Sequence, residues 1–275
     1  MNNRLTAKLP INIGRSIFLL IVLVLVVYGN TLNASWHLDD RTNILDNKNV
    51  HVTSLSFDDW SKSVLPPFND PGKATSGLSG LYRPVAMLTF AINWFLGGAD
   101  VFGYHLVNIG LHCVTSILLF FTCLHILNTP LINGRYQEND CFIAFLATAL
   151  WALHPIQTQA VTYVVQRMAV LADLFYLAGI CLYLEGRNSN SFKKRALFFG
   201  MGILSYMLAL GSKQNAITLP AACLLVEIVF FQPHGFWNQG RVRWIGIGIV
   251  TGLAAFFVLA LFYWQADPIS TIMEV

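Results

Sequence analysis

Long apolar runs separated by short polar segments dominate the chain. A bilayer core of about 30 Å is crossed by roughly 20 mostly apolar residues in a helix, and seven segments approach that template. They lie near residues 16–33, 104–127, 141–154, 168–185, 196–212, 216–231 and 244–264. The third is short and ends at His154-Pro155, so we expect it to be tilted, kinked or only partly spanning. The pattern predicts an all-α integral membrane protein with about seven transmembrane helices, forming a single transmembrane module over residues 1–275.

A further apolar stretch, residues 85–96, is too short to span comfortably and follows Arg83-Pro84, a typical helix start. We interpret it as an interfacial helix on the membrane surface. If it spanned, the basic clusters at residues 187–195 and 241–243 would be external, whereas the positive-inside rule favours a cytoplasmic place for them. With the N-terminus cytoplasmic, residues 31–102 then form a large first external loop that contains interfacial helices. The chemistry is expected on the external side.

Composition supports this class and excludes others. The chain is 55% hydrophobic and only 11% charged, with a mean hydropathy of +0.57, which excludes an ordinary soluble domain. The net charge of +3 comes from short clusters instead of a basic stripe, so nucleic acid is not expected as a partner and membrane lipid is. The five cysteines all lie in apolar segments and lack zinc spacing, so neither a disulfide framework nor a metal site is predicted.

Two adjacent carboxylates, Asp39 and Asp40, follow the first span within a few residues. A carboxylate held at the membrane surface can act as a general base on an acceptor hydroxyl, and partial desolvation would raise its pKa toward a useful value. The alternative is an ordinary hydrated turn. For a second pair, Asp58 and Asp59, we favour a structural reason, because acidic residues stabilise the N-terminus of a short helix.

Three cations are expected at the external membrane edge, against the positive-inside trend: Arg83, Arg167 and Lys213. A lipid phosphate would explain them, since Arg binds phosphate through a planar fork and Lys through a point charge. The alternative is snorkelling of each side chain to the interface.

The second span carries a polar stripe, because His105, Asn108, His112 and Ser116 recur at helical spacing. Such a stripe must face protein or a cavity, and hydrogen bonding between helices is its commoner use. In the fourth span Asp173 is deep enough to be costly, and an ion pair with Arg167 or Lys213 is favoured over catalysis.

The order of several short strings resembles the GT-C superfamily of polytopic glycosyltransferases, and within it the transmembrane and tetratricopeptide-repeat O-mannosyltransferases and their bacterial branch. The strings are HLDD at 37–40, LYRP at 81–84, HLVN at 105–108, ALHPIQT at 152–158, YVVQR at 163–167 and KQNA at 213–216. The resemblance implies transfer of a sugar from a polyprenyl-phosphate donor to a hydroxyl of a protein or glycan acceptor on the external face, with inversion.

The resemblance also implies roles for residues. Asp39 would be the general base and Asp40 its catalytic neighbour, while Arg83, Arg167 and Lys213 would bind the donor phosphate. Supporting polar residues would be His105, Asn108, His112 and His154. No cofactor is implied beyond the donor substrate; a divalent metal held by the acidic pair is an alternative that the resembled branch does not favour.

The sequence carries no tetratricopeptide repeats, so we interpret it either as a fragment or as a minimal form that works with a separate acceptor-binding subunit. The alternatives from other classes are a transporter or flippase of lipid-linked sugar, which would need broken helices in paired halves, and an inactive membrane scaffold. A bacterial inner membrane is the expected location, with the active site in the periplasm.

Overall fold

The structure is a computed structural model that describes residues 12–64, 83–136 and 139–231. The chain divides into two compact units, Met1–Pro220 and Ala221–Val275. Helix α9 (Leu219–Val226) begins in the first unit and ends in the second, and the π-helical turn η6 (Glu227–Phe231) belongs to the second. All other elements described below belong to the first unit. The described residues are helical or irregular, with no strand among them.

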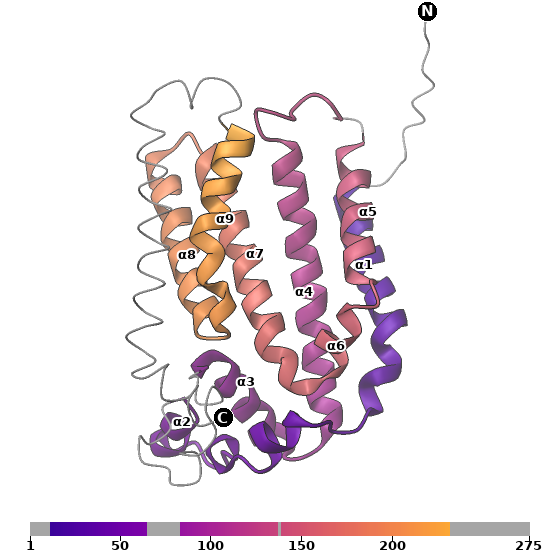
Figure 1. Cartoon of the computed structure of the whole chain (residues 1–275), viewed down its shortest axis with the longest axis vertical. Coiled ribbons are helices and arrows are strands. Elements are labelled where there is room, and N and C mark those ends of the chain that lie inside the picture. The colour runs from indigo at the N-terminus through magenta and orange to yellow at the C-terminus, as the bar shows by residue number, and fades with distance from the viewer. Residues whose placement is uncertain (1–11, 65–82, 137–138, 232–275) are drawn as a thin grey trace, which may run out of the picture. The chain divides into compact units, whose positions relative to one another are not determined.

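Five longer helices form the body of the first unit (Figure 1). They are α1 (Ile13–Tyr28), α4 (Val101–Leu127), α5 (Asp140–Ala152), α7 (Arg167–Asn188) and α8 (Phe192–Leu210). Helix α7 packs against both α4 and α8, and α4 also contacts α1 and α5, which contact each other. Each of these helices runs opposite to the one before it along the chain, so α1, α5 and α8 end where α4 and α7 begin. We call this the loop end of the bundle.

Short elements gather at the loop end. After α1 come η1 (Gly29–Asn33), η2 (Arg41–Leu45), η3 (Lys48–Val50), α2 (Phe57–Val64) and α3 (Pro84–Gly97), and between α5 and α7 come α6 (Gln157–Thr162) and η4 (Val164–Gln166). The turn η5 (Gln214–Thr218) follows α8. Figure 1 shows α2, α3 and α6 together at this end of the first unit.

Four segments are long and apolar enough to cross a membrane: Ile13–Asn33, Val101–Leu127, Val164–Asn188 and Gln214–Phe231. They correspond to the first, second, fourth and sixth predicted spans, so the chain is a multi-span membrane protein. The third predicted span forms α5, which has only 13 residues. The fifth forms α8, whose first turn carries three cations, Lys193, Lys194 and Arg195, and the seventh lies outside the described residues.

Two predicted helix starts are confirmed. Helix α3 has 14 residues and begins at Pro84, as the Arg83-Pro84 sequence predicts. Helix α2 begins at Phe57 with Asp58 and Asp59 in its first turn, where their charges meet the helix dipole, and Asp58 pairs with Lys62. This accounts for the second acidic pair structurally.

A hydrophobic core at the loop end joins the segment after α1 to three helices. Its buried members are Ile44, Val50, Ala86, Phe90, Tyr104, Val164, Val165, Met168 and Leu171. Because Ile44 and Val50 are fully buried here, the polar segment that follows α1 is folded against α3, α4 and α7. The acidic pair therefore lies on a fixed framework.

Candidate functional site

The acidic pair lies on a tight turn that follows the first span. Leu38 adopts a positive φ of 34° although it is not a glycine, and its side chain is 85% exposed. A leucine in this conformation stores backbone strain, which persists only where the surrounding contacts fix it. The turn directs the side chains of Asp39 and Asp40 to different environments.

Asp40 is fully buried. Its Oδ2 accepts a hydrogen bond of 3.0 Å from the His37 backbone N–H, and its Oδ1 accepts one of 2.6 Å from the Val165 backbone N–H. Burial raises the pKa of the Asp40 carboxyl, while the two N–H groups and the neighbouring His37 and His105 act in the opposite direction. Asp40 thus ties its turn to the start of α7.

Asp39 is exposed. Its backbone N–H donates to the Tyr163 hydroxyl at 2.9 Å, and its carbonyl accepts from the side chains of Thr42 and Asn43. Burial raises the pKa of the Tyr163 hydroxyl, and the charges of Asp39 and Asp40 raise it further, so Tyr163 stays neutral. The Asp39 main chain is held in place, its side chain also interacts with the Tyr163 hydroxyl, and the residue is exposed, so an incoming hydroxyl can reach it.

Arg83 lies half-buried at the start of α3. Its Nη1 donates to the Met168 sulfur at 2.8 Å, and its Nε is buried with no hydrogen-bond partner among the described residues. Burial lowers the pKa of Arg83, but a guanidinium remains charged in proteins. A half-buried cation whose contact is a weakly accepting thioether is suited to an anionic ligand.

Arg167 occupies a different environment from the one expected of a phosphate ligand. It is fully buried, and its guanidinium donates to Asn108 Oδ1 at 2.7 Å, to Asn93 Oδ1 at 2.6 Å, and to the carbonyls of Thr89 and Tyr104. It also lies over the rings of Phe90 and Tyr104. These contacts satisfy four of its donor positions with neutral groups and join α7 to α3 and α4.

Lys213 lies just beyond α8, close to the start of α3. The Val85 backbone N–H donates to the Gly211 carbonyl at 3.0 Å, two residues after Arg83 and two before Lys213. A Cβ on Gly211 would come within 2.8 Å of the Val85 side chain, so a glycine permits this close approach. Arg83 and Lys213 are thereby held at the same end of the bundle.

The polar stripe of α4 faces the protein interior, as predicted. The Nε2–H of His105 donates to the Ala34 carbonyl at 3.1 Å, and Asn108 donates to the carbonyls of Val161 and Val164 while it accepts from Arg167. His112 bonds the Ala152 carbonyl at 2.9 Å. All three are buried, and each connects α4 to a different segment.

The two remaining candidates, His154 and Asp173, are both exposed. His154 is exposed and accepts a hydrogen bond from the Ile156 backbone N–H at 3.2 Å, in the turn between α5 and α6. Asp173 has no ion-pair contact within 4 Å of Arg167 or Lys213 in the part of the chain that the structure describes, although the charge of Lys213 acts on it. No group of three or more His, Cys, Asp or Glu side chains that could hold a metal ion occurs among the described residues.

One short segment, residues 163–168, connects the parts of the site, and we call it the junction segment. Tyr163 bonds Asp39, Val165 bonds Asp40, Arg167 bonds α3 and α4, and Met168 contacts Arg83. The role of Tyr163 as a support for Asp39 was not anticipated from the sequence. The two residues are 124 positions apart, and no local pattern indicates such a contact.

Several curated proteins are similar to this chain over most of its length. Protein O-mannosyl-transferase Tmtc1 of Drosophila melanogaster is 34% identical over 242 residues, which cover 85% of this chain and 24% of the relative. Protein O-mannosyl-transferase Tmtc3 of the same organism is 32% identical, covering 75% of this chain and 23% of the relative. Human protein O-mannosyl-transferase TMTC3 is 27% identical, covering 80% and 22%.

The chain is therefore related to these O-mannosyl-transferases, and it spans about a quarter of their length. No family model matches the chain, and no solved structure matches it.

Proposed function

We propose that this chain is the membrane-embedded catalytic module of a glycosyltransferase of the O-mannosyltransferase type. In this proposal a polyprenyl-phosphate-linked sugar is the donor, and a hydroxyl of a protein or glycan is the acceptor. The observation that carries the proposal is the junction segment, which fastens an exposed carboxylate and a half-buried guanidinium to one end of a membrane bundle. The relatives' names support the reaction class.

Asp39 is the proposed general base. Its carboxylate takes the proton of the acceptor hydroxyl while the acceptor oxygen attacks the anomeric carbon. The bond from that carbon to the phosphate oxygen breaks, its electron pair leaves with the polyprenyl phosphate, and the anomeric configuration inverts. Because phosphate is a good leaving group, a second carboxylate acting as an acid is not needed. Asp40, which is buried and doubly hydrogen-bonded, instead positions the turn.

Arg83 and Lys213 are the proposed phosphate ligands. The free Nε–H of Arg83 supports this, because a phosphate oxygen is the kind of charged acceptor that would satisfy it. Arg167 is better suited to support the site than to touch the donor, since most of its donors already serve Asn93, Asn108 and two carbonyls. The leaving phosphate would thus meet two cations that the fold holds near each other.

The loop end is proposed to face the external or periplasmic side, with the N-terminus in the cytoplasm. The basic residues at the end of α7 and the start of α8 support this orientation, because they lie at the opposite end of the bundle (Figure 1). Acceptor selection by a further segment or a separate subunit is also part of the proposal.

Sugar transfer in membranes tests the proposal. Membranes carrying the wild-type chain or Asp39→Asn would be incubated with a mixed pool of radiolabelled polyprenyl-phosphate sugars and scored for label in protein and glycan. A lost general base costs about 100-fold or more, so the variant should transfer at background level. The matched control is Asp58→Asn, an exposed aspartate in the first turn of α2 that pairs with Lys62.

Equal transfer by wild type and Asp39→Asn would remove Asp39 as the base. Movement of the labelled lipid across the membrane without transfer, by both proteins, would favour a flippase instead. Equal loss in Asp58→Asn would mean that surface charge, and not Asp39, determines activity.

A further inference from the structure

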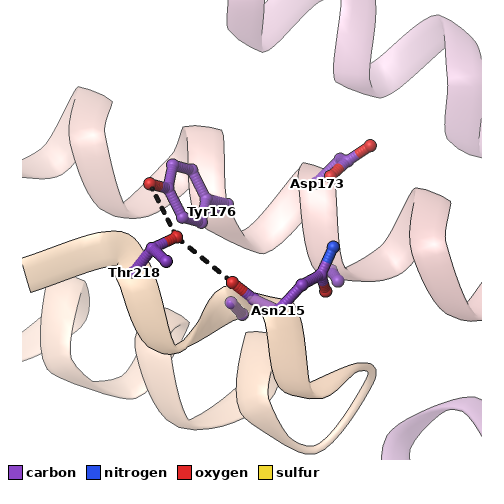
Figure 2. A pocket seen from close by; sticks show the side chains of 6 residues that line it. Asp173, Tyr176, Asn215 and Thr218 are labelled. Atoms are coloured by element: carbon purple, nitrogen blue, oxygen red, sulfur yellow. Dashed lines mark hydrogen bonds between the residues drawn. The ribbon is translucent and has the colours of Figure 1, made fainter. Parts of the chain in front are cut away.

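A cavity of about 220 Å³ lies between α7 and the η5 turn. It is lined by Ala172, Asp173, Tyr176, Asn215, Ala216 and Thr218. Figure 2 shows Asp173 and Asn215 facing the same space from the two elements, with the Tyr176 and Thr218 hydroxyls beyond them. The cavity is smaller than the roughly 300–1,000 Å³ of pockets for drug-sized ligands, so it suits one small polar molecule or ring.

The polar groups of this cavity are partly committed and partly free. The hydroxyls of Tyr176 and Thr218 lie 3.3 Å apart, and Thr218 donates to the Asn215 carbonyl at 3.1 Å. Figure 2 draws no hydrogen bond to the Asp173 carboxylate or the Asn215 side-chain amide, and the charge of Lys213 acts on Asp173. The side chains of Asp173 and Asn215 are thus available to a ligand. The hydrogen-bonded hydroxyls of Tyr176 and Thr218 form the ordered part of the cavity lining.

The position of Asp173, a charged residue within a membrane span, calls for a physical explanation. Asp173 is exposed on the surface of the first unit although it lies within the membrane span Val164–Asn188. An intramembrane carboxylate is costly and usually marks a functional position. Six residues separate it from Arg167, which corresponds to about 9 Å along the helix, so it lies near the loop end and not at mid-membrane.

We propose that this cavity binds the sugar ring of the lipid-linked donor, an inference that rests on the proposed function. A carboxylate only accepts hydrogen bonds, whereas an amide both donates and accepts. Neighbouring sugar hydroxyls, each able to do both, match Asp173 and Asn215. Lys213 precedes Asn215 by two residues and would meet the phosphate attached to that sugar. A phosphate in the cavity itself is disfavoured by the charge of Asp173.

Binding by the full chain in lipid nanodiscs provides the test, with two probes: polyprenyl-phosphate mannose and the same polyprenyl phosphate without sugar. We expect Asp173→Ala to weaken binding of the sugar-bearing lipid by about 10-fold or more, as for a lost hydrogen bond to a charged group. Binding of the bare lipid should change less than about twofold. Asn215→Ala should show the same selectivity, and Asp140→Ala, at the start of α5, is the matched control.

Other outcomes overturn the inference in distinguishable ways. An equal loss for both lipids, or no loss for either, in both variants would mean that the cavity does not bind sugar. If the wild-type chain bound the two lipids equally well but still transferred sugar in an Asp39-dependent manner, the sugar-binding role of the cavity would be refuted while the proposed function would stand. Binding of neither lipid together with no transfer would refute the proposed function as well.

Discussion

Asp39 and Asp40 are neighbours in sequence, yet the fold gives them opposite environments. Asp40 is buried and accepts two backbone N–H groups, whereas Asp39 is exposed and is held by its own main chain. The sequence predicts that the pair matters, but it does not predict this division. Burial of Asp40 depends on Val165, a residue 125 positions away, and such a contact forms only when α1, α4 and α7 pack together.

Tyr163→Phe should lower the rate of sugar transfer without changing the fold. The hydroxyl accepts from the Asp39 backbone N–H, and one hydrogen bond contributes about 0.5–1.5 kcal/mol, so kcat should fall up to about 10-fold. The KM for the donor should not change, because Tyr163 is not a proposed phosphate or sugar ligand. Steady-state transfer assays measure both. Tyr136→Phe, in the exposed turn before α5, is the control and should leave both constants unaltered.

The pKa of Asp40 predicts a pH dependence of stability. Burial raises its pKa in the folded state above the ordinary value of about 3.9. Between those two values the folded chain binds more protons than the unfolded chain, so the Asp40 contribution to stability rises as pH falls. It is fully present below the ordinary value and is lost as pH rises through the raised one.

The Asp40→Asn substitution removes this titration. Comparing the variant with wild type therefore isolates the contribution of Asp40 to the pH dependence of stability. The thermal midpoint of wild type minus that of Asp40→Asn should increase as the pH is lowered from 7 toward about 4. Unfolding in detergent, followed by intrinsic fluorescence across that range, provides the measurement. A difference that shrinks on acidification would mean that the hydrogen bonds from His37 and Val165 outweigh burial.

At the scale of elements, the polar stripe of α4 shows what a sequence pattern can and cannot reveal. Helical spacing correctly predicts that His105, Asn108 and His112 face inward. It does not identify their partners, which are carbonyls of three different segments. The cations illustrate the same limit. The sequence shows that Arg83 and Arg167 are both near the membrane edge, but not that every guanidinium nitrogen of Arg167 donates a hydrogen bond while the buried Nε of Arg83 has no partner among the described residues.

Arg167 should therefore behave as a structural residue. In Arg167→Leu the buried acceptors of Asn93, Asn108 and Thr89 lose their donor, and each unpaired group costs roughly 1–3 kcal/mol. In Arg167→Lys a single ammonium cannot reproduce the planar fork, so part of the loss should remain. Both variants should lower the thermal midpoint markedly, in detergent and in nanodiscs.

The control is Arg135→Leu, an exposed cation in the turn before α5, which should change the midpoint little. A direct phosphate ligand would behave differently. If Arg167→Lys kept the wild-type midpoint and raised only the KM for the donor, Arg167 would be part of the phosphate site, as its sequence position alone suggested.

At the scale of the whole molecule, hydropathy and the fold agree on four spans and differ in the rest. The apolar pattern identifies the first, second, fourth and sixth predicted spans. The pattern cannot decide whether α5 crosses the membrane. This helix has only 13 residues, fewer than the roughly 20 that a span needs, and it packs against α1 and α4, so its apolar residues are also explained by contacts with those helices. Nor can the pattern locate the site, which is assembled by the junction segment from parts far apart in sequence.

The orientation of the bundle yields the last prediction. Residues 34–64 and the turn between α7 and α8 lie at opposite ends of the first unit (Figure 1). The helix ends that flank this turn carry four cations: Arg187, Lys193, Lys194 and Arg195. If these cations are cytoplasmic, the acidic pair is external. Single cysteines at exposed positions, Lys48→Cys and Asn190→Cys, would be introduced after the five native cysteines are replaced.

Treatment of intact cells with a membrane-impermeant maleimide should label Lys48→Cys only. Asn190→Cys should react only after permeabilisation, and Arg135→Cys, in the other turn at that end, should behave in the same way. In cells whose target membrane is internal, sealed vesicles of known sidedness replace intact cells. The reverse pattern would place Asp39 in the cytoplasm and exclude an external acceptor, whereas equal labelling of both sites would contradict the antiparallel arrangement of the helices.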